Sequence, residues 1–131
     1  AHEIVINSDG LNHPTYKDKD KIFNTPAFNY DEVVTLPKDA ILLSSNKVNN
    51  VMALNFETEF SKIWGIQYHP EITYEKMITL IRFRRERLLE NKSFSDEKDL
   101  ESHISMIEKE DKITKKESRM RELKNWLDLI A

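Results

Sequence analysis

The sequence GIQYHPE, residues 65–71, lies at the point where this chain changes its character. All four prolines and both glycines fall within residues 1–70, and none follows Pro70. Glycine and proline favour turns and interrupt regular structure, whereas an uninterrupted stretch of mixed charge suits solvated helical faces. The composition therefore predicts a strand-rich part over residues 1–71 and a helical part over residues 72–131, packed together as one domain.

Short runs of β-branched and other apolar residues predict strands in the first part. In one of them, Met52, Leu54 and Phe56 alternate with the residues between them, as expected for a strand in a sheet. Pro26 lies in an extended segment that should be an edge or carry a break. The expected strands are residues 3–7, 31–37, 40–46, 51–57 and 62–70.

From Ile72 onward the apolar residues repeat with helical spacing. The spacing predicts three helices, the first beginning near Ile72, the second near Ser95 and the third near residues 114–117. The last helix has Met120, Leu123, Leu127 and Ile130 on one face, a stripe of the kind that usually packs into a core. The strands are too many and too apolar for three helices to cover both faces of their sheet. We therefore expect something else to cover the second face.

Composition narrows the class of protein. The chain has 131 residues, enough for one core, with 39% hydrophobic residues and a net charge of −3. No apolar run approaches the roughly 20 residues that span a bilayer. The basic runs at residues 82–87 and 115–121 are interleaved with glutamate and lack an aromatic platform, so neither nucleic acid nor membrane is expected as a partner. Residues 1–10 lack the features of a signal peptide, and a cytoplasmic location is the default expectation.

His69 and Glu71 are the candidate catalytic residues. Positions i and i+2 of an extended segment point to the same side, so Glu71 can hold one nitrogen of the His69 imidazole. The other nitrogen is then free to act as a general base. Pro70 lacks an N–H and ends sheet pairing there, which leaves the pair at a strand terminus. A histidine near a strand end is more often only a polar terminus, and the spacing alone favours that ordinary explanation.

The sequence contains no pattern that indicates a metal site, a thiol nucleophile or a disulfide. The chain has no cysteine, which excludes disulfides, thiolate ligands and a thiol nucleophile inside it. The four histidines are scattered and match no metal-ligand spacing. Neither a metal nor an organic cofactor is expected.

The octapeptide WGIQYHPE, residues 64–71, resembles the C-terminal signature of class I glutamine amidotransferases. Three further stretches are similar to the stand-alone, GMP-synthase-like members of that family: GLNHPTYKDK at 10–19, PAFNYDEVVTLPKDAILLSSN at 26–46 and RMRELKNWLD at 119–128. The resemblance implies a flavodoxin-like α/β fold. This chain would be the C-terminal half of that domain, with a mixed sheet followed by about three helices.

The resemblance also implies a Cys-His-Glu triad that hydrolyses the side-chain amide of glutamine to glutamate and ammonia. His69 would activate the cysteine thiol and protonate the leaving ammonia, and Glu71 would orient His69. The nucleophile would lie upstream of the matched region, in an N-terminal half that becomes a required partner. We therefore expect an enzyme of which this chain, taken alone, is inactive.

The segment around Asn29 departs from the family pattern, because many relatives have a histidine at that position. Asn29, Tyr30 and Asp31 are the expected substrate-binding residues. Two alternatives remain open: an inactive binding or regulatory module of the same fold, and a relative that hydrolyses γ-glutamyl peptides. A synthase or other ammonia acceptor, or a second copy of this chain, would be a further partner.

Overall fold

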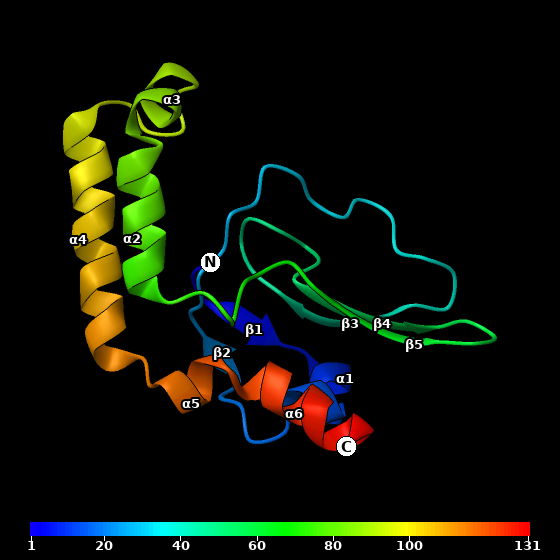
Figure 1. The fold of residues 1–131 in the computed structure, drawn as a ribbon. Helices are drawn as coiled ribbons and strands as arrows, with labels where there is room; N and C mark the ends of the chain where they lie inside the picture. Colours follow the sequence, from blue (N-terminus) through cyan, green and yellow to red (C-terminus); the bar gives the residue numbers. More distant parts are fainter. The chain divides into compact units, whose positions relative to one another are not determined.

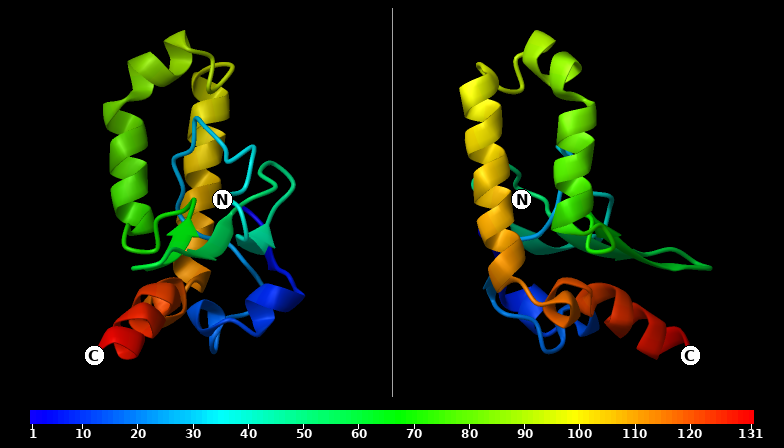
Figure 2. Two further views of the ribbon diagram at one scale, coloured as in Figure 1. Left: turned by 90° about the vertical axis from the view of Figure 1, so that its right-hand side faces the viewer. Right: turned by 60° about the vertical axis from the view of Figure 1, so that its left-hand side comes forward.

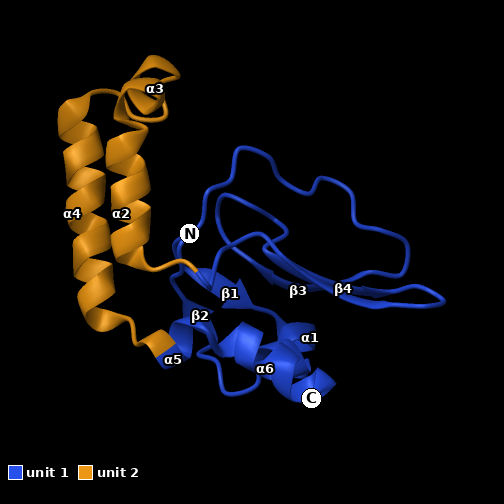
Figure 3. Cartoon of the chain, in the orientation of Figure 1, with its two compact units in different colours: residues 1–71, 117–131 blue, residues 72–116 orange.

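The computed structural model describes all residues from 1 to 131, and the chain divides into two compact units. The first unit combines residues 1–71 with residues 117–131, and the second comprises residues 72–116 (Figure 3). The strand-rich part of the first unit therefore ends at Glu71, directly after the last proline of the sequence. The last fifteen residues return to it.

The first unit is built on a five-stranded sheet in the order β2-β1-β3-β4-β5 (Figure 1). All four strand pairings are antiparallel. The α/β class is confirmed, and the parallel strands of a flavodoxin-like sheet are not among these pairings. The strands are β1 (Ile4–Ile6), β2 (Ile22–Phe23), β3 (Ile41–Ser45), β4 (Ala53–Glu57) and β5 (Lys62–Ile66).

Helical segments of the first unit lie near its two ends in sequence. They are α1 (Ser8–Leu11), the 3-10 turn η1 (Pro14–Tyr16), α5 (Lys116–Arg119) and α6 (Arg121–Ile130). Helix α5 begins one residue before the boundary between the units. Helix α6 packs against η1, although more than 100 residues separate them in the chain: Asn125 Nδ2 donates to the carbonyl oxygens of Thr15 and Lys17 at 2.8 and 2.9 Å.

The core of the first unit lies on one face of the sheet. Ile4 and Ile6 point inward from β1, and a register shift between Leu42 and Ser44 lets consecutive residues Leu43 and Ser44 both be buried. The buried core residues are Ile4, Ile6, Tyr16, Phe23, Leu43, Met52, Ala53 and Tyr68. On the opposite face, the register partners Val5 and Ile22 are 38% and 56% exposed, so this face is uncovered at β1 and β2, whereas Leu54 of β4 is 8% exposed.

The second unit is a helical hairpin with α2 (Tyr74–Phe83), α3 (Arg85–Glu90) and α4 (Glu97–Ile113). Thr73 and Asp96 cap the N-termini of α2 and α4 through their side chains. The two long helices run alongside each other (Figure 2), and Arg82 of α2 pairs with Glu101 of α4 at 3.2 Å. Their buried apolar residues are Met77, Ile81, Leu100, Ile104 and Ile107.

Residues 31–37 form no strand, so that prediction was wrong. Their β-branched residues do not suffice, because a strand needs a hydrogen-bonding neighbour and no pairing of the sheet includes them. Val34 is 86% exposed as a result. Residues 24–40 instead form a long connection between β2 and β3.

Gly10 allows α1 to approach β3 closely, and this contact gives a stability prediction. A Cβ atom at Gly10 would lie 2.2 Å from the backbone oxygen of Leu43 and 2.6 Å from Cγ2 of Ile6. Because the Leu43 backbone cannot yield cheaply, Gly10→Ala should destabilise the fold by about 1–3 kcal/mol. Gly65→Ala is the matched control, since its Cβ would meet Leu54 at an ordinary 3.4 Å. Urea unfolding measures both, and equal stability of the two variants would contradict the prediction.

Candidate active site

His69 and Glu71 form a directly bonded pair just after the last strand. The imidazole Nδ1 of His69 lies 2.8 Å from Oε1 of Glu71. Strand β5 ends at Ile66, but the backbone stays anchored, because Gln67 N donates to Met52 O and His69 N donates to Pro26 O, each at 2.8 Å. The two side chains are 41% and 53% exposed, so the pair is accessible from solvent. Pro70 and Glu71 lie in a turn, so the expected contact between the two side chains forms across a turn and not along an extended strand.

The carboxyl group of Glu71 is held in its ionised form. Partial burial raises its pKa, but the hydrogen bond from His69 and the positive charges of His69 and Arg119 outweigh that effect. The net result is a Glu71 pKa below its usual value. At neutral pH the pair therefore offers an ionised carboxylate that accepts a hydrogen bond from Nδ1–H of His69.

The second nitrogen of His69 is available for chemistry. Nε2 has no hydrogen-bond partner within the chain, and Phe28 contacts the ring at a centroid distance of 6.2 Å. When Nδ1 donates to Glu71, Nε2 keeps a lone pair that can accept a proton from a nucleophile. A histidine with one ring nitrogen bonded to a carboxylate and the other unpaired has the geometry of a general base and its orienting group.

The residues on either side of His69 are held by the C-terminal segment. Tyr68 donates its hydroxyl to Oε1 of Glu122 at 2.9 Å, and Arg119 donates to the carbonyl oxygen of Pro70. Tyr68, Arg119 and Glu122 are all buried. Sequence reasoning missed Arg119 and Glu122, because about fifty residues separate them from His69. A buried charge within the otherwise amphipathic α6 was not visible in the apolar spacing.

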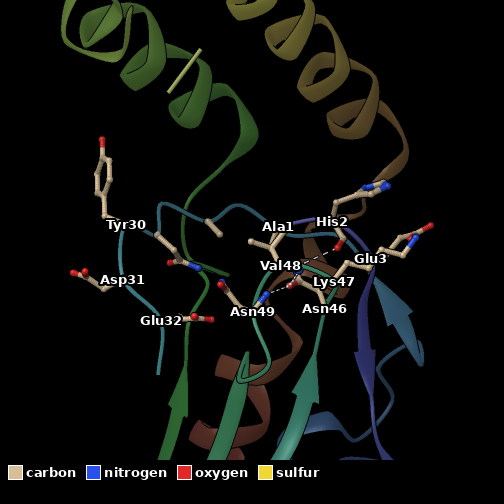
Figure 4. Close-up of a pocket in the computed structure, with 12 residues that line it drawn as sticks. Ala1, His2, Glu3, Tyr30, Asp31, Glu32, Asn46, Lys47, Val48 and Asn49 are labelled. Atoms are coloured by element: carbon tan, nitrogen blue, oxygen red, sulfur yellow. Dashed lines mark hydrogen bonds and ion pairs between the residues drawn. The ribbon is translucent and has the colours of Figure 1, made fainter. Parts of the chain in front are cut away.

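The expected substrate-binding residues Asn29, Tyr30 and Asp31 line a neighbouring pocket of about 850 Å³ (Figure 4). Tyr30 and Asp31 lie on one side of it, and the turn at residues 46–49 lies on the other. Neither His69 nor Glu71 is among the lining residues. The connection between β2 and β3 links the two places, because Phe28 contacts His69 while Asn29 lines the pocket.

No group of three histidine or carboxylate side chains is placed to hold a metal ion. No helix of the structure is long and apolar enough to cross a membrane.

The structure is an α/β domain in which a hydrogen-bonded histidine and carboxylate follow the last strand. A comparison with curated proteins finds similarity to a gamma-glutamyl-L-1-hydroxyisopropylamide hydrolase from Pseudomonas sp.. The two are 28% identical over 147 aligned positions, covering 100% of this chain and 50% of the relative. The chain thus spans about half the length of this curated relative.

No family model matches the chain, and no solved structure matches it.

Proposed function

We propose that this chain is the histidine- and glutamate-bearing part of an enzyme that hydrolyses γ-glutamyl amides through a Cys-His-Glu triad. The observation that carries the proposal is the 2.8 Å contact between His69 Nδ1 and Glu71, with Nε2 left unpaired. The cysteine belongs to a polypeptide segment outside residues 1–131, since this sequence contains none. The similarity to a hydrolase named for a γ-glutamyl amide supports the choice of substrate class.

In the proposed mechanism, His69 Nε2 accepts the thiol proton as the cysteine sulfur attacks the γ-carbonyl carbon. Glu71 remains ionised and stabilises the imidazolium that forms. His69 then gives the proton to the departing nitrogen, the C–N bond breaks, and ammonia or an amine leaves a γ-glutamyl thioester. Water, deprotonated by His69, attacks the thioester and releases glutamate and the thiol. The sum is one amide and one water converted to one carboxylic acid and one amine.

Two substrates fit this mechanism. Glutamine, whose hydrolysis yields ammonia for an acceptor, is the first candidate, by resemblance to the glutamine amidotransferases. N-substituted γ-glutamyl amides are the second, and the named activity of the Pseudomonas relative favours them. In either case Asn29, Tyr30 and Asp31 are the proposed contacts for the glutamyl group, because they line a pocket and follow Phe28, which contacts the His69 ring.

The cysteine-bearing segment is also the partner proposed for the uncovered sheet face. Val5 and Ile22 lie side by side there and are substantially exposed, and apolar surface of this kind is costly in water. The Pseudomonas relative is about twice as long as the region it shares with this chain. A segment of that length could supply both the nucleophile and the missing cover.

The test compares residues 1–131 with the polypeptide encoded when the upstream coding sequence is included. Each is incubated with L-glutamine and with γ-glutamyl isopropylamide, and glutamate release is measured. We expect residues 1–131 alone to match buffer and the longer polypeptide to turn over one of the two amides. Its Cys→Ser variant is the matched control and should be inactive.

Two results would overturn the proposal. The first is turnover well above buffer by pure residues 1–131. The second is the absence of an active cysteine enzyme: either the upstream sequence contains no cysteine, or the longer polypeptide hydrolyses neither amide. Either observation would favour an inactive binding or regulatory module. The ratio of rates on the two amides decides between the substrates.

A further inference from the structure

The C-terminal segment, residues 117–131, forms hydrogen bonds with the residues on both sides of His69. Glu122, at the start of α6, accepts the hydrogen bond of the Tyr68 hydroxyl at 2.9 Å. Arg119, at the end of α5, donates to the carbonyl oxygen of Pro70. These two contacts flank His69 by one residue in each direction. Pro70 and Arg119 also stand on either side of the second unit in sequence, so this hydrogen bond joins the chain where residues 72–116 leave the first unit and return to it.

Glu122 is itself held in place by buried polar contacts. Lys19 Nζ lies 3.1 Å from Oε1 and 3.2 Å from Oε2 of Glu122, and it also donates to the carbonyl oxygen of Ser118 at 2.7 Å. The side chains of Lys19 and Glu122 are 1% and 4% exposed. Hydrogen bonds to ionised groups are short and strong in such surroundings. Glu122 is therefore a rigid acceptor for Tyr68.

Tyr68 continues the network into the core. Its hydroxyl also lies 2.9 Å from that of Tyr16, which in turn lies 2.8 Å from Oγ of Ser44. Burial raises the pKa of Tyr16 to about 12 and that of Tyr68 well above 10, so both hydroxyls keep their protons at neutral pH. Each hydroxyl can therefore donate a hydrogen bond. The Tyr68 side chain is held by the hydrogen bonds of its hydroxyl and by the contact of its ring with Phe23.

The catalytic pair has little packing of its own. The side chains of His69 and Glu71 are about half exposed, and the aromatic neighbour of the imidazole ring is Phe28, at a centroid distance of 6.2 Å. Their relative position must then come from the backbone of residues 68–71, which the side chain of Tyr68, the amide of His69 and the carbonyl of Pro70 anchor at three successive points. Two of these three anchors are in the C-terminal segment. A small misplacement of a catalytic base costs a large share of its activity.

We propose that Arg119 and Glu122 are positioning residues, which hold Pro70 and Tyr68 so that the His69–Glu71 pair keeps its geometry. This inference rests on the proposed function for the role of His69, but its test observes the pair directly. It requires neither substrate nor cysteine. A failure of the hydrolase proposal and a failure of this one are therefore distinguishable.

The experiment follows the carboxyl carbon of Glu71 by ¹³C NMR as a function of pH, in the full 131-residue chain. His69→Gln removes the imidazole, so the Glu71 pKa should rise toward its ordinary value. The size of this rise is the reference for the other variants. Tyr68→Phe deletes the hydroxyl bonded to Glu122, and Arg119→Lys keeps the positive charge but loses the guanidinium geometry. We expect each to raise the Glu71 pKa by a large part of the His69→Gln rise.

Tyr16→Phe is the matched control. It deletes the neighbouring hydroxyl of the same buried network but leaves the bond from Tyr68 to Glu122 intact. We expect a Glu71 pKa equal to that of the wild type. An unchanged pKa in both Tyr68→Phe and Arg119→Lys would overturn the proposal. An equal rise in Tyr16→Phe would overturn it as well, since this would indicate general loosening of the core. Arg119→Lys retains charge and most of the volume, so it provides a folded test if Tyr68→Phe does not fold.

Discussion

His69→Ala in the completed, cysteine-bearing polypeptide is expected to lower kcat/KM for γ-glutamyl amide hydrolysis by about 10²–10⁴-fold, the usual contribution of a positioned general acid–base. The substitution removes the base that, in the proposed mechanism, takes the thiol proton and protonates the departing nitrogen. Initial rates of glutamate release measure the effect. KM should change less than kcat, because the imidazole acts on the reacting atoms and not on the glutamyl group.

His103→Ala is the control for this prediction. His103 is a histidine of the second unit that contacts Phe94, and it has no part in the proposed site. Its loss should leave the rate unchanged. Glu71→Gln should give a rate between the wild type and His69→Ala, since the amide can still orient the ring but cannot stabilise an imidazolium as a carboxylate does. Wild-type activity in His69→Ala would show that the base lies elsewhere.

Lys19→Met is expected to have the largest effect on stability, about 3–5 kcal/mol, which is typical of removing one partner of a buried ion pair. Glu122 would remain almost fully buried as a carboxylate, with the Tyr68 hydroxyl as its remaining side-chain donor. The substitution would also remove the cation–π contact of Lys19 Nζ with the ring of Phe23, whose centroid lies 4.3 Å from Nζ. Urea unfolding at neutral pH measures the free energy of unfolding.

The double variant Lys19→Met/Glu122→Leu completes the cycle. Replacing both charges by apolar side chains removes the uncompensated carboxylate, so it should recover much of the stability that Lys19→Met loses. Lys62→Met is the surface control, because Lys62 and Glu57 are 3.8 Å apart and mostly exposed, and such pairs contribute little. A Lys19→Met variant as stable as Lys62→Met would contradict the argument that the Lys19–Glu122 pair is a buried anchor.

Local sequence signals predicted most of the secondary structure. The alternation in residues 51–57 and the apolar run from Lys62 correspond to the β4–β5 hairpin, where Leu54 pairs with Gly65 and Asn55 with Trp64. Helical spacing after Ile72 correctly predicted α2 and α4, since their buried residues repeat every three or four positions. The failure at residues 31–37 has a different origin, because strand formation depends on a neighbour that local sequence does not reveal.

Helix α6 shows the opposite of the expected burial. Its stripe of Met120, Leu123, Leu127 and Ile130 was predicted to pack into the core, yet Met120 and Leu123 are only partly buried and Leu127 and Ile130 are more than half exposed. Glu122 and Asn125 are buried in their place. The Asn125 amide reaches two backbone carbonyls of the segment around η1, and Glu122 reaches Lys19 and Tyr68. Polar groups can be buried when each finds such a partner, and periodicity alone cannot show that the partners exist.

The candidate site likewise has some features that local sequence predicts and others that depend on tertiary contacts. The order His69-Pro70-Glu71 was enough to predict the contact between the imidazole and the carboxylate, although β5 ends at Ile66 and the contact forms across a turn at Pro70 and Glu71. Local geometry of this kind depends on a few neighbouring residues. That Arg119 and Glu122 hold the residues flanking His69, and that residues 29–31 line a pocket with residues 46–49, depended on segments many residues apart meeting in space. Such meetings are decided by the packing of the whole unit, in which each buried charge must find its partner.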